Sequence, residues 1–418
     1  MVTFGAVGDI CLARTCGRHI EKNGEVWPFE LMRPFLDRAD LLFGNMESVV
    51  LPPDYPEEQI DPEGLVSKFD ASGALKVAGF DILNMASNHI LDGGPGGMFH
   101  TRNRIEALGI ATAGVGQTQQ EARQMRVLEA GGLRFGFLCY CEDNNYTCGT
   151  MGPCHAYYVP EIVLEDIAAS KSRVDVLVVS VHADLEYMET PSVPRREDFR
   201  RFARAGATLV LGHHPHVPQG VEQVDGALIV YSLGNFFFFP HNMPYHRNKL
   251  PHTAHSFLLL AEVSRDGVES FTRVPFEIQN PPNVRPGPLE GRAAEQLLAY
   301  LTELDRWCGD DDRVKSNWRH VAMDKLEGYL AEVKAMDRDD RTWRGRALRR
   351  LEKCLGREDR VDIDRILQEY LGPLLFVAEN QSWMNEILQA VKEKWAAHQR
   401  QVDPYHRPEY ALSRRQQR

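Results

Sequence analysis

The sequence has little that would place the chain in a membrane or on nucleic acid. Among its 418 residues no stretch is long and apolar enough to span a bilayer. Basic residues are in the minority, with 48 Lys and Arg against 59 Asp and Glu, and the formal net charge is -11. This balance argues against a broad nucleic-acid surface but leaves room for a local pocket that binds anions.

A targeting segment and internal repeats are also missing. A strand-like run starts almost at Met1, so no basic segment and apolar core of a signal peptide precede it. We therefore expect a cytoplasmic chain, unless a leader has been trimmed. No repeat of fixed period is present, and no feature of the sequence fixes an oligomeric state.

The eight cysteines fit a reducing compartment and lack the paired Cys-x-x-Cys knuckles of a typical zinc site. One segment contains Cys139, Cys141, Cys148 and Cys154, with His155 beside the last. We favour a strand in which Cys139 is a small buried residue, followed by a loop. A structural zinc site is the alternative.

Up to about Ile278, apolar strand-like runs alternate with stretches such as GMFHTRNRIEALG, in which apolar residues recur at helical spacing. This alternation predicts an α/β fold with parallel strands buried between helices. SFLLLAEVS and GVESFTRVPFEI flank a turn and predict a hairpin at an edge of the sheet.

The composition changes after residue 280. Residues 281–291 are rich in Pro and Gly and predict a linker between a domain at 1–280 and a helical domain at 292–418. The second domain is highly charged and has amphipathic spacing. Its repeated Trp and Leu positions predict a bundle core, and a face that binds a partner is the alternative.

Six apolar runs end abruptly in polar side chains that bind metals or polar groups. The runs end at Asp9, at Glu47, at Asn88 and His89, at His182, at His214 and His216, and at Asn235. An open α/β sheet places its chemistry beyond the carboxyl ends of its strands, so we expect these side chains to converge. The pattern favours a metal centre over a packed core.

Some of these positions have a competing interpretation. His214 and His216 are two residues apart and would project to the same side, but GHHPH alone could be a surface loop. His182 could be a satisfied core histidine, and Glu47 a helix N-cap or part of an ion pair. His89 is a candidate for proton transfer, with Asp92 orienting its ring.

The motifs GDICLAR, GNMES, SNHILDGG, SVHADLEY, GHHPHVPQG and YSLGNF, in this order, resemble those of the CapA-type poly-γ-glutamate synthesis protein family. That family belongs to the calcineurin-like metallophosphoesterase superfamily. The resemblance covers residues 1–280 and leaves the α-helical C-terminal domain outside. It implies a metallophosphoesterase-like α/β fold, in which layered sheets are flanked by helices, and a catalytic domain at 1–280.

The resemblance also implies two divalent metal ions. The implied ligands are Asp9 and His216 for one ion, Asn88, His182 and His214 for the other, and Glu47 as a bridge. Such a pair would polarise a phosphoryl or carbonyl oxygen and generate a hydroxide nucleophile, with His89 as general acid. Manganese, zinc and iron all suit these donors.

The chain departs from the family pattern at two places. Cys11 stands where the superfamily has a His, and its thiol is either a replacement ligand or an inert buried group. Ala183-Asp184 replaces the usual Trp-Gly and adds a carboxylate near the site. Further residues expected behind the ligands or against the substrate are Cys11, His213, Asp184, Ser232, Asn235 and His255.

Two segments are candidates for substrate contacts. Residues 237–255 carry four His among aromatics and form either a substrate lid or an ordinary His-rich loop. Arg195, Arg196, Arg200 and Arg201 could bind phosphate or carboxylate groups, but their spacing favours the solvated face of a helix.

These observations leave three functions. The first is a metal-dependent hydrolase that cleaves a phosphoester of a small or oligomeric anionic substrate. The second is the hydrolysis or assembly of poly-γ-glutamate, against which the missing surface anchor counts. The third is a metal-binding interaction protein without catalysis, in which Cys11 marks a decayed site and the helical domain is the binding module.

Overall fold

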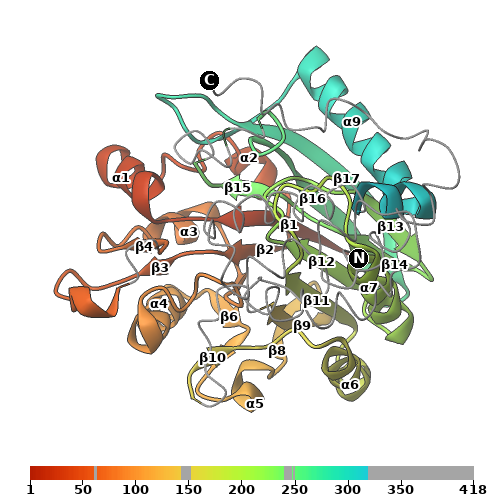
Figure 1. Cartoon of the computed structure of the whole chain (residues 1–418), viewed down its shortest axis with the longest axis horizontal. Coiled ribbons are helices and arrows are strands. Elements are labelled where there is room, and N and C mark those ends of the chain that lie inside the picture. The colour runs from red at the N-terminus through yellow and green to blue at the C-terminus, as the bar shows by residue number, and fades with distance from the viewer. Residues whose placement is uncertain (61–63, 143–151, 240–246, 248–249, 319–418) are drawn as a thin grey trace, which may run out of the picture. The chain divides into compact units, whose positions relative to one another are not determined.

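Two β-sheets packed face to face form the centre of the fold (Figure 1). The computed structural model describes residues 1–60, 64–142, 152–239, 247 and 250–318. The chain divides into two compact units, Met1–Asp310 and Asp311–Arg418. In the second unit, the described residues 311–318 are helical.

The first sheet has the strand order β18-β17-β16-β1-β2-β5-β6, and β15 pairs with β1 in addition. Its parallel strands are β1 (Val2–Ile10), β2 (Leu41–Met46), β5 (Ile82–Asn84), β6 (Ala111–Ala113) and β15 (Asn235–Phe237). Its antiparallel strands are β16 (His255–Ser264), β17 (Gly267–Ile278) and β18 (Pro286–Pro288).

The second sheet has the strand order β13-β14-β12-β11-β9-β8. Its parallel strands are β9 (Leu133–Cys141), β11 (Val176–His182), β12 (Leu209–His213) and β14 (Ala227–Val230). Its antiparallel edges are β8 (Arg126–Ala130) and β13 (Val221–Val224). Two small ribbons pair β3 (Val49–Val50) with β4 (Val66–Ser67), and β7 (Val115–Gly116) with β10 (Cys154–His155).

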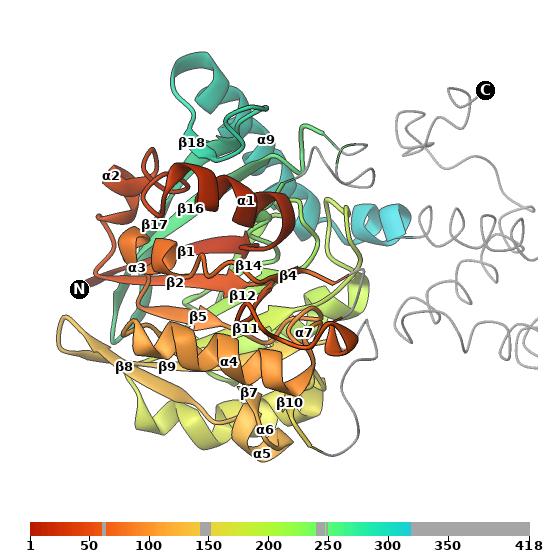
Figure 2. The same cartoon turned by 90° about the vertical axis from the view of Figure 1, so that its left-hand side faces the viewer.

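Helices cover the outer faces of both sheets, so the first unit has four layers (Figure 2). The first sheet is covered by α1 (Arg14–Asn23), α2 (Arg33–Leu36), α3 (Gly73–Ala78) and α4 (Gly94–Ala107). The second sheet is covered by α5 (Gln119–Ala122), α6 (Pro160–Ser170) and α7 (Val193–Ala205). Short 3-10 turns are η1 (Glu57–Gln59) and η2 (Lys171–Arg173).

The core between the sheets is rich in stacked phenylalanines. The Phe4 ring of β1 stacks on Phe135 of β9, with ring centroids 6.1 Å apart. Phe43 of β2 stacks on Phe137 at 5.9 Å. All four side chains are buried. Because these rings come from both sheets, they fix the distance between the sheets and therefore between the strand ends.

The sequence-based expectations for this unit are confirmed in outline. The fold is α/β with layered sheets flanked by helices, and its central strands run parallel. The predicted hairpin is β16 and β17, although β18 lies outside it at the edge of the sheet. Among the described residues, no helix has both the length and the apolar character needed to cross a bilayer.

The region after residue 280 is more ordered than a linker. Residues 286–288 of the Pro- and Gly-rich segment 281–291 pair with β17 as β18. The helix α9 (Gly291–Gly309) packs Leu301 and Leu304 into the core that lies between the sheets. The first unit therefore extends to Asp310, past the predicted boundary at 280. Most of the predicted helical domain, from residue 319 onward, lies outside the described residues.

The phenylalanine core yields a test of stability. Phe137→Ala removes a fully buried ring that contacts both Phe43 and Phe4, so we expect it to lower the free energy of unfolding by about 3–5 kcal/mol. Urea unfolding of wild type and variant measures this difference. Val26→Ala, at a side chain that is 57% exposed, is the control and should change it by less than about 0.5 kcal/mol. Equal effects of the two substitutions would contradict the role of the core.

Candidate metal centre

The carboxyl ends of five strands from both sheets meet at one place. Asp9 lies in β1 opposite Asn45 of β2, and Asn45 lies opposite Asn84 of β5. In the other sheet, His182 is the last residue of β11 and lies opposite His213, the last residue of β12. The predicted convergence of strand ends thus occurs, with the first sheet supplying the carboxylates and the second the imidazoles.

Three groups of side chains at this place could each bind a metal ion. Within each group, the atoms that would donate to the metal lie within 4.8 Å of one another. The groups are Asp9, Glu47 and His216; Glu47, His182 and His214; and Glu186, His214 and His216. The first two share Glu47, the residue predicted to bridge two ions. Asn88 lies beside the second group, because its Oδ1 is 2.9 Å from His182 Nε2.

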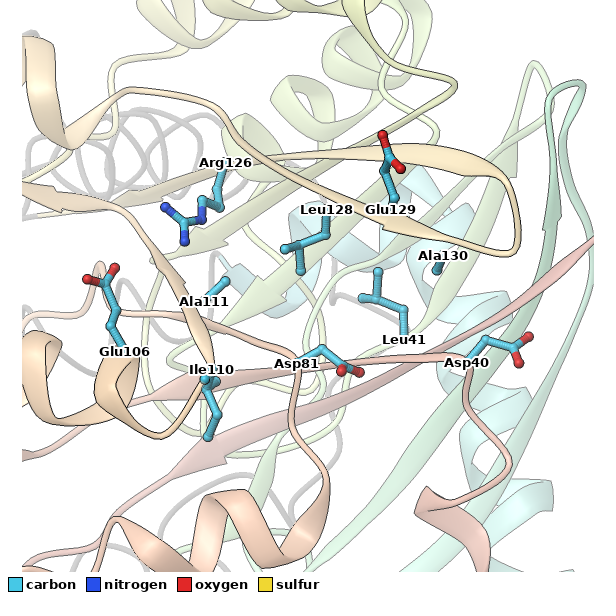
Figure 3. A pocket seen from close by; sticks show the side chains of 11 residues that line it. Asp40, Leu41, Asp81, Glu106, Ile110, Ala111, Arg126, Leu128, Glu129 and Ala130 are labelled. Carbon is cyan, nitrogen blue, oxygen red and sulfur yellow. The ribbon is translucent and has the colours of Figure 1, made fainter.

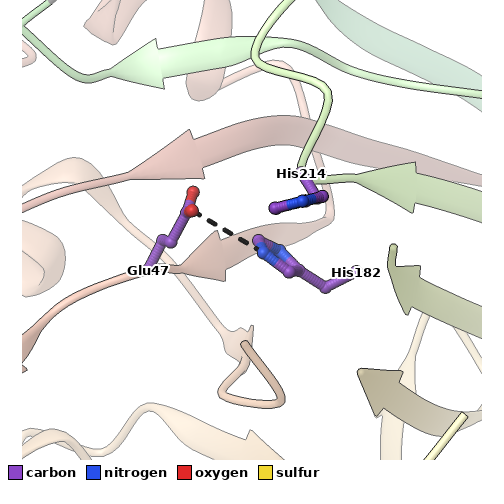
Figure 4. Close-up of side chains that lie close together, drawn as sticks. All are labelled: Glu47, His182 and His214. Atoms are coloured by element: carbon purple, nitrogen blue, oxygen red, sulfur yellow. Dashed lines mark ion pairs between the residues drawn. The ribbon is translucent and has the colours of Figure 1, made fainter. Parts of the chain in front are cut away.

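The carboxylate of Glu47 is at the centre of the site (Figure 4). Its Oε1 lies 3.6 Å from His182 Nε2 and 3.5 Å from His216 Nε2. Both carboxylate oxygens are buried, and within the described residues neither accepts a hydrogen bond. A buried carboxylate without hydrogen-bond donors is costly, so this position suits a cation shared with the imidazoles.

The His216 ring lies between the two carboxylates, with Nδ1 3.4 Å from Asp9 Oδ2 and Nε2 3.5 Å from Glu47 Oε1. Its Nδ1 donates to Asn235 Oδ1 at 2.9 Å. The orientation of the Asn235 amide is fixed in turn, because Nδ2 donates to the backbone oxygens of His216 and Thr253. The Nε2 atom therefore faces Glu47. Asn235 therefore fixes the orientation of the His216 ring.

A ladder of amides ties the two sheets together beneath the site. Asn84 Nδ2 donates to Asn45 Oδ1 at 2.8 Å, and Asn45 Nδ2 donates to Asp9 Oδ1 at 2.8 Å. The same Asn45 amide lies 3.1 Å from His182 Nδ1. Asn45 and Asn84 were missed by the sequence analysis, because asparagines within apolar strands resemble ordinary strand residues.

Two glycines allow the strands to approach closely here. A Cβ on Gly8 would lie 1.8 Å from the backbone oxygen of Gly234, and one on Gly212 would lie 1.8 Å from that of Tyr231. The Asp9 amide donates to the same Gly234 oxygen at 2.9 Å. These contacts explain why glycine precedes Asp9 and the His213-His214 pair.

Backbone strain is concentrated at this site. Among the described residues, six other than glycine have positive φ angles. Four of them are Asp184, Tyr187, His214 and His216, at 91°, 65°, 93° and 58°. Each such conformation costs on the order of 1–3 kcal/mol and persists only where the surroundings impose it. The two loops after β11 and β12 therefore hold their side chains in directions that relaxed loops would not choose.

Burial and charge give the three imidazoles different protonation states. Burial lowers the pKa of His182 well below its usual range and the pKa of His214 to about 4. For His216, burial alone would lower the pKa, but the charges of Glu47 and Asp9 outweigh it and raise the pKa to about 10. At neutral pH, His182 and His214 are neutral donors, while His216 carries a proton that a metal ion would displace.

The pKa values of the two central carboxylates shift in opposite directions. Burial would raise the pKa of Asp9, but the neighbouring His213 and His216 imidazoles outweigh it and hold the pKa below its usual range. For Glu47 burial dominates, and the charge of His216 opposes it only in part, so its pKa is raised well above the usual range. Burial therefore disfavours the charged form of Glu47, a cost that a bound cation would remove.

His89 and Asp92 form the predicted pair beside the ligands. His89 Nδ1 lies 2.7 Å from Asp92 Oδ2, which also accepts from the Leu65 amide at 2.6 Å. The Asp92 side chain is buried, while the side chain of His89 is 23% exposed. The carboxylate therefore fixes the ring and leaves Nε2 available for proton exchange.

The other predicted residues take supporting places or lie away from the centre. His213 Nδ1 lies 3.6 Å from Asp9 Oδ1. The Cys11 side chain packs with Ala13, Leu65 and Phe238, and no donor group above includes a cysteine. Ser232 Oγ donates to the Val217 backbone oxygen and accepts from the Gly234 amide.

His255 is the first residue of β16, with its Nε2 3.8 Å from Glu277 Oε2, and it belongs to none of the donor groups. Residues 240–246 and 248–249 of the predicted lid 237–255, including His241 and His246, lie outside the described residues. Cys148 lies outside them too. Cys139 packs in the core between the sheets, as favoured from the sequence.

The arginines of α7 differ from the expected solvated face. Arg195 and Arg196 are buried. Arg195 Nη2 donates to Glu142 Oε2 at 3.0 Å, and its guanidinium carbon lies 3.9 Å from the ring centroid of Tyr158. The spacing of FRRFARAG could not show this, because Arg195 lies at the start of the helix, where it turns toward the end of β9.

A separate pocket of about 340 Å³ lies at the opposite ends of the strands (Figure 3). It is lined by Asp40 and Asp81, which directly precede β2 and β5. Asp40 accepts a hydrogen bond from the Thr3 amide and Asp81 from the Leu42 amide. Both carboxylates thus bind backbone amides near the starts of neighbouring strands. No predicted site residue lines the pocket.

Comparison with known proteins gives consistent matches. A family model described as Bacterial capsule synthesis protein PGA_cap matches residues 3–239, which include all six motifs. The capsule biosynthesis protein CapA of Bacillus anthracis is 28% identical over 335 residues, covering 77% of this chain and 79% of the relative. The PGA biosynthesis protein CapA of Bacillus subtilis (strain 168) is 28% identical over 330 residues, covering 77% and 83%.

Solved structures with a similar arrangement include two 5'-nucleotidases. The precursor from Thermus thermophilus has a TM-score of 0.42 and 14% identity, covering 72% of this chain and 58% of that one. The enzyme from Candida albicans has a TM-score of 0.38 and 12% identity, covering 75% and 55%.

Asp184 gives a test of the electrostatics of this region. Burial raises its pKa from 3.8 to about 6, with Arg195 opposing the shift. A folded-state pKa above the unfolded value contributes stability that is fully present below pH 3.8 and is lost as the pH rises through 6. Asp184→Asn abolishes this titration. We therefore expect the unfolding free energy of the variant, relative to wild type, to increase by roughly 2–2.5 kcal/mol between pH 4 and pH 7.5.

Urea unfolding with a chelator present, at a series of pH values, measures this difference. Titrations of other groups cancel because they occur in both proteins. A difference that stays constant over this range, or that falls with pH, would contradict the raised pKa of Asp184.

Proposed function

Because the chain belongs to the bacterial capsule synthesis protein family, we propose that it is a metal-dependent hydrolase that uses two divalent ions to cleave a phosphoester. The observation that carries this proposal is the environment of Glu47. Its two buried oxygens accept no hydrogen bond within the described residues, and imidazole nitrogens lie 3.5 and 3.6 Å from one of them. A pair of cations would satisfy this carboxylate and both imidazoles together.

The donor set fits such ions in number and chemistry. Asp9 and His216 would hold one ion, His182, His214 and Asn88 the other, and Glu47 both. Mixed carboxylate, imidazole and amide donors suit manganese, zinc or iron. When bound, these ions would polarise a phosphoryl oxygen and supply a hydroxide near neutral pH.

His89 supplies the proton that the leaving group needs. Cleavage of the P–O bond leaves negative charge on the departing oxygen, and a positioned imidazolium transfers a proton to it from Nε2. Asp92, bonded to Nδ1, stabilises the charged ring before the transfer and holds its orientation. Since the ring is partly exposed, water can return the proton after each turnover.

The centre would favour an anionic substrate, either small or oligomeric. Two divalent ions exceed the charge of Asp9 and Glu47, so the loaded site carries net positive charge. Phosphate groups and clustered carboxylates both fit this electrostatic requirement.

A second candidate function is hydrolysis or assembly of poly-γ-glutamate. The relatives named capsule biosynthesis and PGA biosynthesis proteins favour it. The same centre would then act on an amide carbonyl, with His89 protonating the leaving nitrogen. The substrates differ in the bond that is broken, so one assay with two substrate classes separates them.

The proposed function predicts that turnover depends on added metal. The full-length chain, stripped with a chelator, should hydrolyse nitrophenyl phosphomonoesters or diesters only after manganese, zinc or iron is added. His216→Ala removes a ligand and should abolish the recovery. If the chain cleaves γ-glutamyl oligomers but neither ester, the second function is favoured. If it binds metal but cleaves none of these substrates, a non-catalytic role is favoured.

A separate prediction isolates the role of His89. His89→Ala should lower kcat for a phosphoester about 100-fold or more, because general acid catalysis typically contributes 10²–10⁴-fold. The metal content, measured by inductively coupled plasma mass spectrometry, should equal that of wild type, because none of the donor groups includes His89. A substrate with a good leaving group needs less help and should be affected less. Unchanged kcat for a poor leaving group would remove the proton-transfer role.

A further inference from the structure

Glu186 is a carboxylate at the candidate metal centre to which the sequence motifs assign no role. It lies in the loop that joins β11 to α7. Its Oε1 is 3.9 Å from His216 Nε2, and it forms a donor group with His214 and His216. The side chain of Glu186 is 41% exposed, whereas that of His216 is buried. Glu186 therefore approaches the centre from the solvent side.

The loop that carries Glu186 is fastened to the loop that carries the histidines. The Tyr187 amide donates to the Pro215 backbone oxygen at 2.7 Å, and Gln219 Nε2 donates to the Met188 backbone oxygen at 2.8 Å. The Tyr187 ring stacks on the His216 ring, with centroids 6.1 Å apart. Since Tyr187 also has a φ angle of 65°, the surroundings impose this loop conformation and with it the direction of Glu186.

The geometry around His216 Nε2 fits a shared ion. With Nδ1 bonded to Asn235, Nε2 faces two carboxylate oxygens, Glu47 Oε1 at 3.5 Å and Glu186 Oε1 at 3.9 Å. Two donors that each lie about 2.1 Å from one tetrahedral ion are about 3.4 Å apart. The two separations from His216 Nε2 are close to this value. None of the donor groups contains both Glu47 and Glu186, so a rotation of the half-exposed Glu186 side chain has to bring its carboxylate to the ion.

The ion at this position also needs another donor. Asp9, Glu47 and His216 supply three protein groups. Zinc typically takes four ligands, and manganese prefers six oxygen-rich ones. We propose that Glu186 is an additional ligand that caps the ion held by Asp9, Glu47 and His216 on its solvent side. This inference rests on the metal centre of the proposed function and deepens it.

The cap has a consequence for the substrate. Buried ligands are held by neighbouring strands and amides, but Glu186 can leave the ion and remain hydrated. An oxygen of an anionic substrate would then take its place on the ion. Glu186 thereby keeps the ion in place between turnovers and opens one coordination position when substrate arrives. The competing explanation is a plain ion pair between Glu186 and the His216 imidazolium, which needs no metal.

Metal titration of the full-length chain separates these explanations. The chelator-stripped protein is titrated with manganese alone by calorimetry, and bound manganese is counted by electron paramagnetic resonance. We expect two ions in wild type. Glu186→Gln keeps the shape of the side chain but is a poorer ligand, so the affinity of one of the two sites should fall at least about 10-fold. Substitution of residues that only support a ligand already lowers metal affinity by about 10–100-fold. The other site should keep its affinity.

Glu189→Gln is the matched control. Glu189 belongs to the same loop, but its carboxylate contacts Tyr300 and His252 rather than the donor groups. It should bind both ions as wild type does, and the thermal unfolding of the metal-free variants shows whether each is folded. His216→Ala should lose the site that Glu186→Gln weakens.

Unchanged affinities in Glu186→Gln would overturn the inference and leave the proposed function standing. Equal weakening in Glu189→Gln would also overturn it, because the loop and not the carboxylate would then be responsible. A wild-type chain that binds neither manganese, zinc nor iron would overturn the metal centre itself and the cap with it.

Discussion

Two carboxylates buried side by side at the ends of β1 and β2 impose the constraint on which the rest of the site depends. Asp9 is supported by hydrogen bonds from Asn45 and from the His214 amide. Glu47 has no such support among the described residues. Burying like charges together is costly unless a cation or a proton compensates them. In the metal-free chain the proton on the His216 ring offsets part of this charge. A fold selected only for stability would have no reason to retain this arrangement.

The strained loops fit the same constraint. His214 and His216 hold positive φ angles, which place two imidazoles on one side of a short turn. The conformational free energy that these two φ angles cost is small compared with the stability that the stacked phenylalanines and the paired sheets supply. Rigidity matters here because metal affinity depends on ligands that need not be reorganised. The amide ladder from Asn84 to Asp9 and His182 spreads this rigidity across both sheets.

Much of the fold, and the convergence of polar side chains at one edge of the sheets, could be predicted from the sequence for a physical reason. Parallel strands end at a common edge, so polar residues that interrupt apolar runs, such as Asp9 and His182, mark that edge directly. Glu186 carries no such mark, because it follows its strand at a distance and only the contacts between two loops bring it back. The place of α9 was hidden for a similar reason. Its amphipathic spacing shows an apolar face but not that the face completes the core between the sheets.

The exposure of the side chains indicates how a substrate reaches the ions. The six predicted ligands are at most 4% exposed, whereas the side chains of His89 and Glu186 are 23% and 41% exposed. A substrate therefore meets a proton donor and a displaceable carboxylate before it meets the ligands. His89 directly follows the ligand Asn88, while Glu186 comes from the loop after β11. Because these two groups reach the centre on different segments, one can serve the leaving group while the other controls access to an ion, and the chemistry on each can change independently.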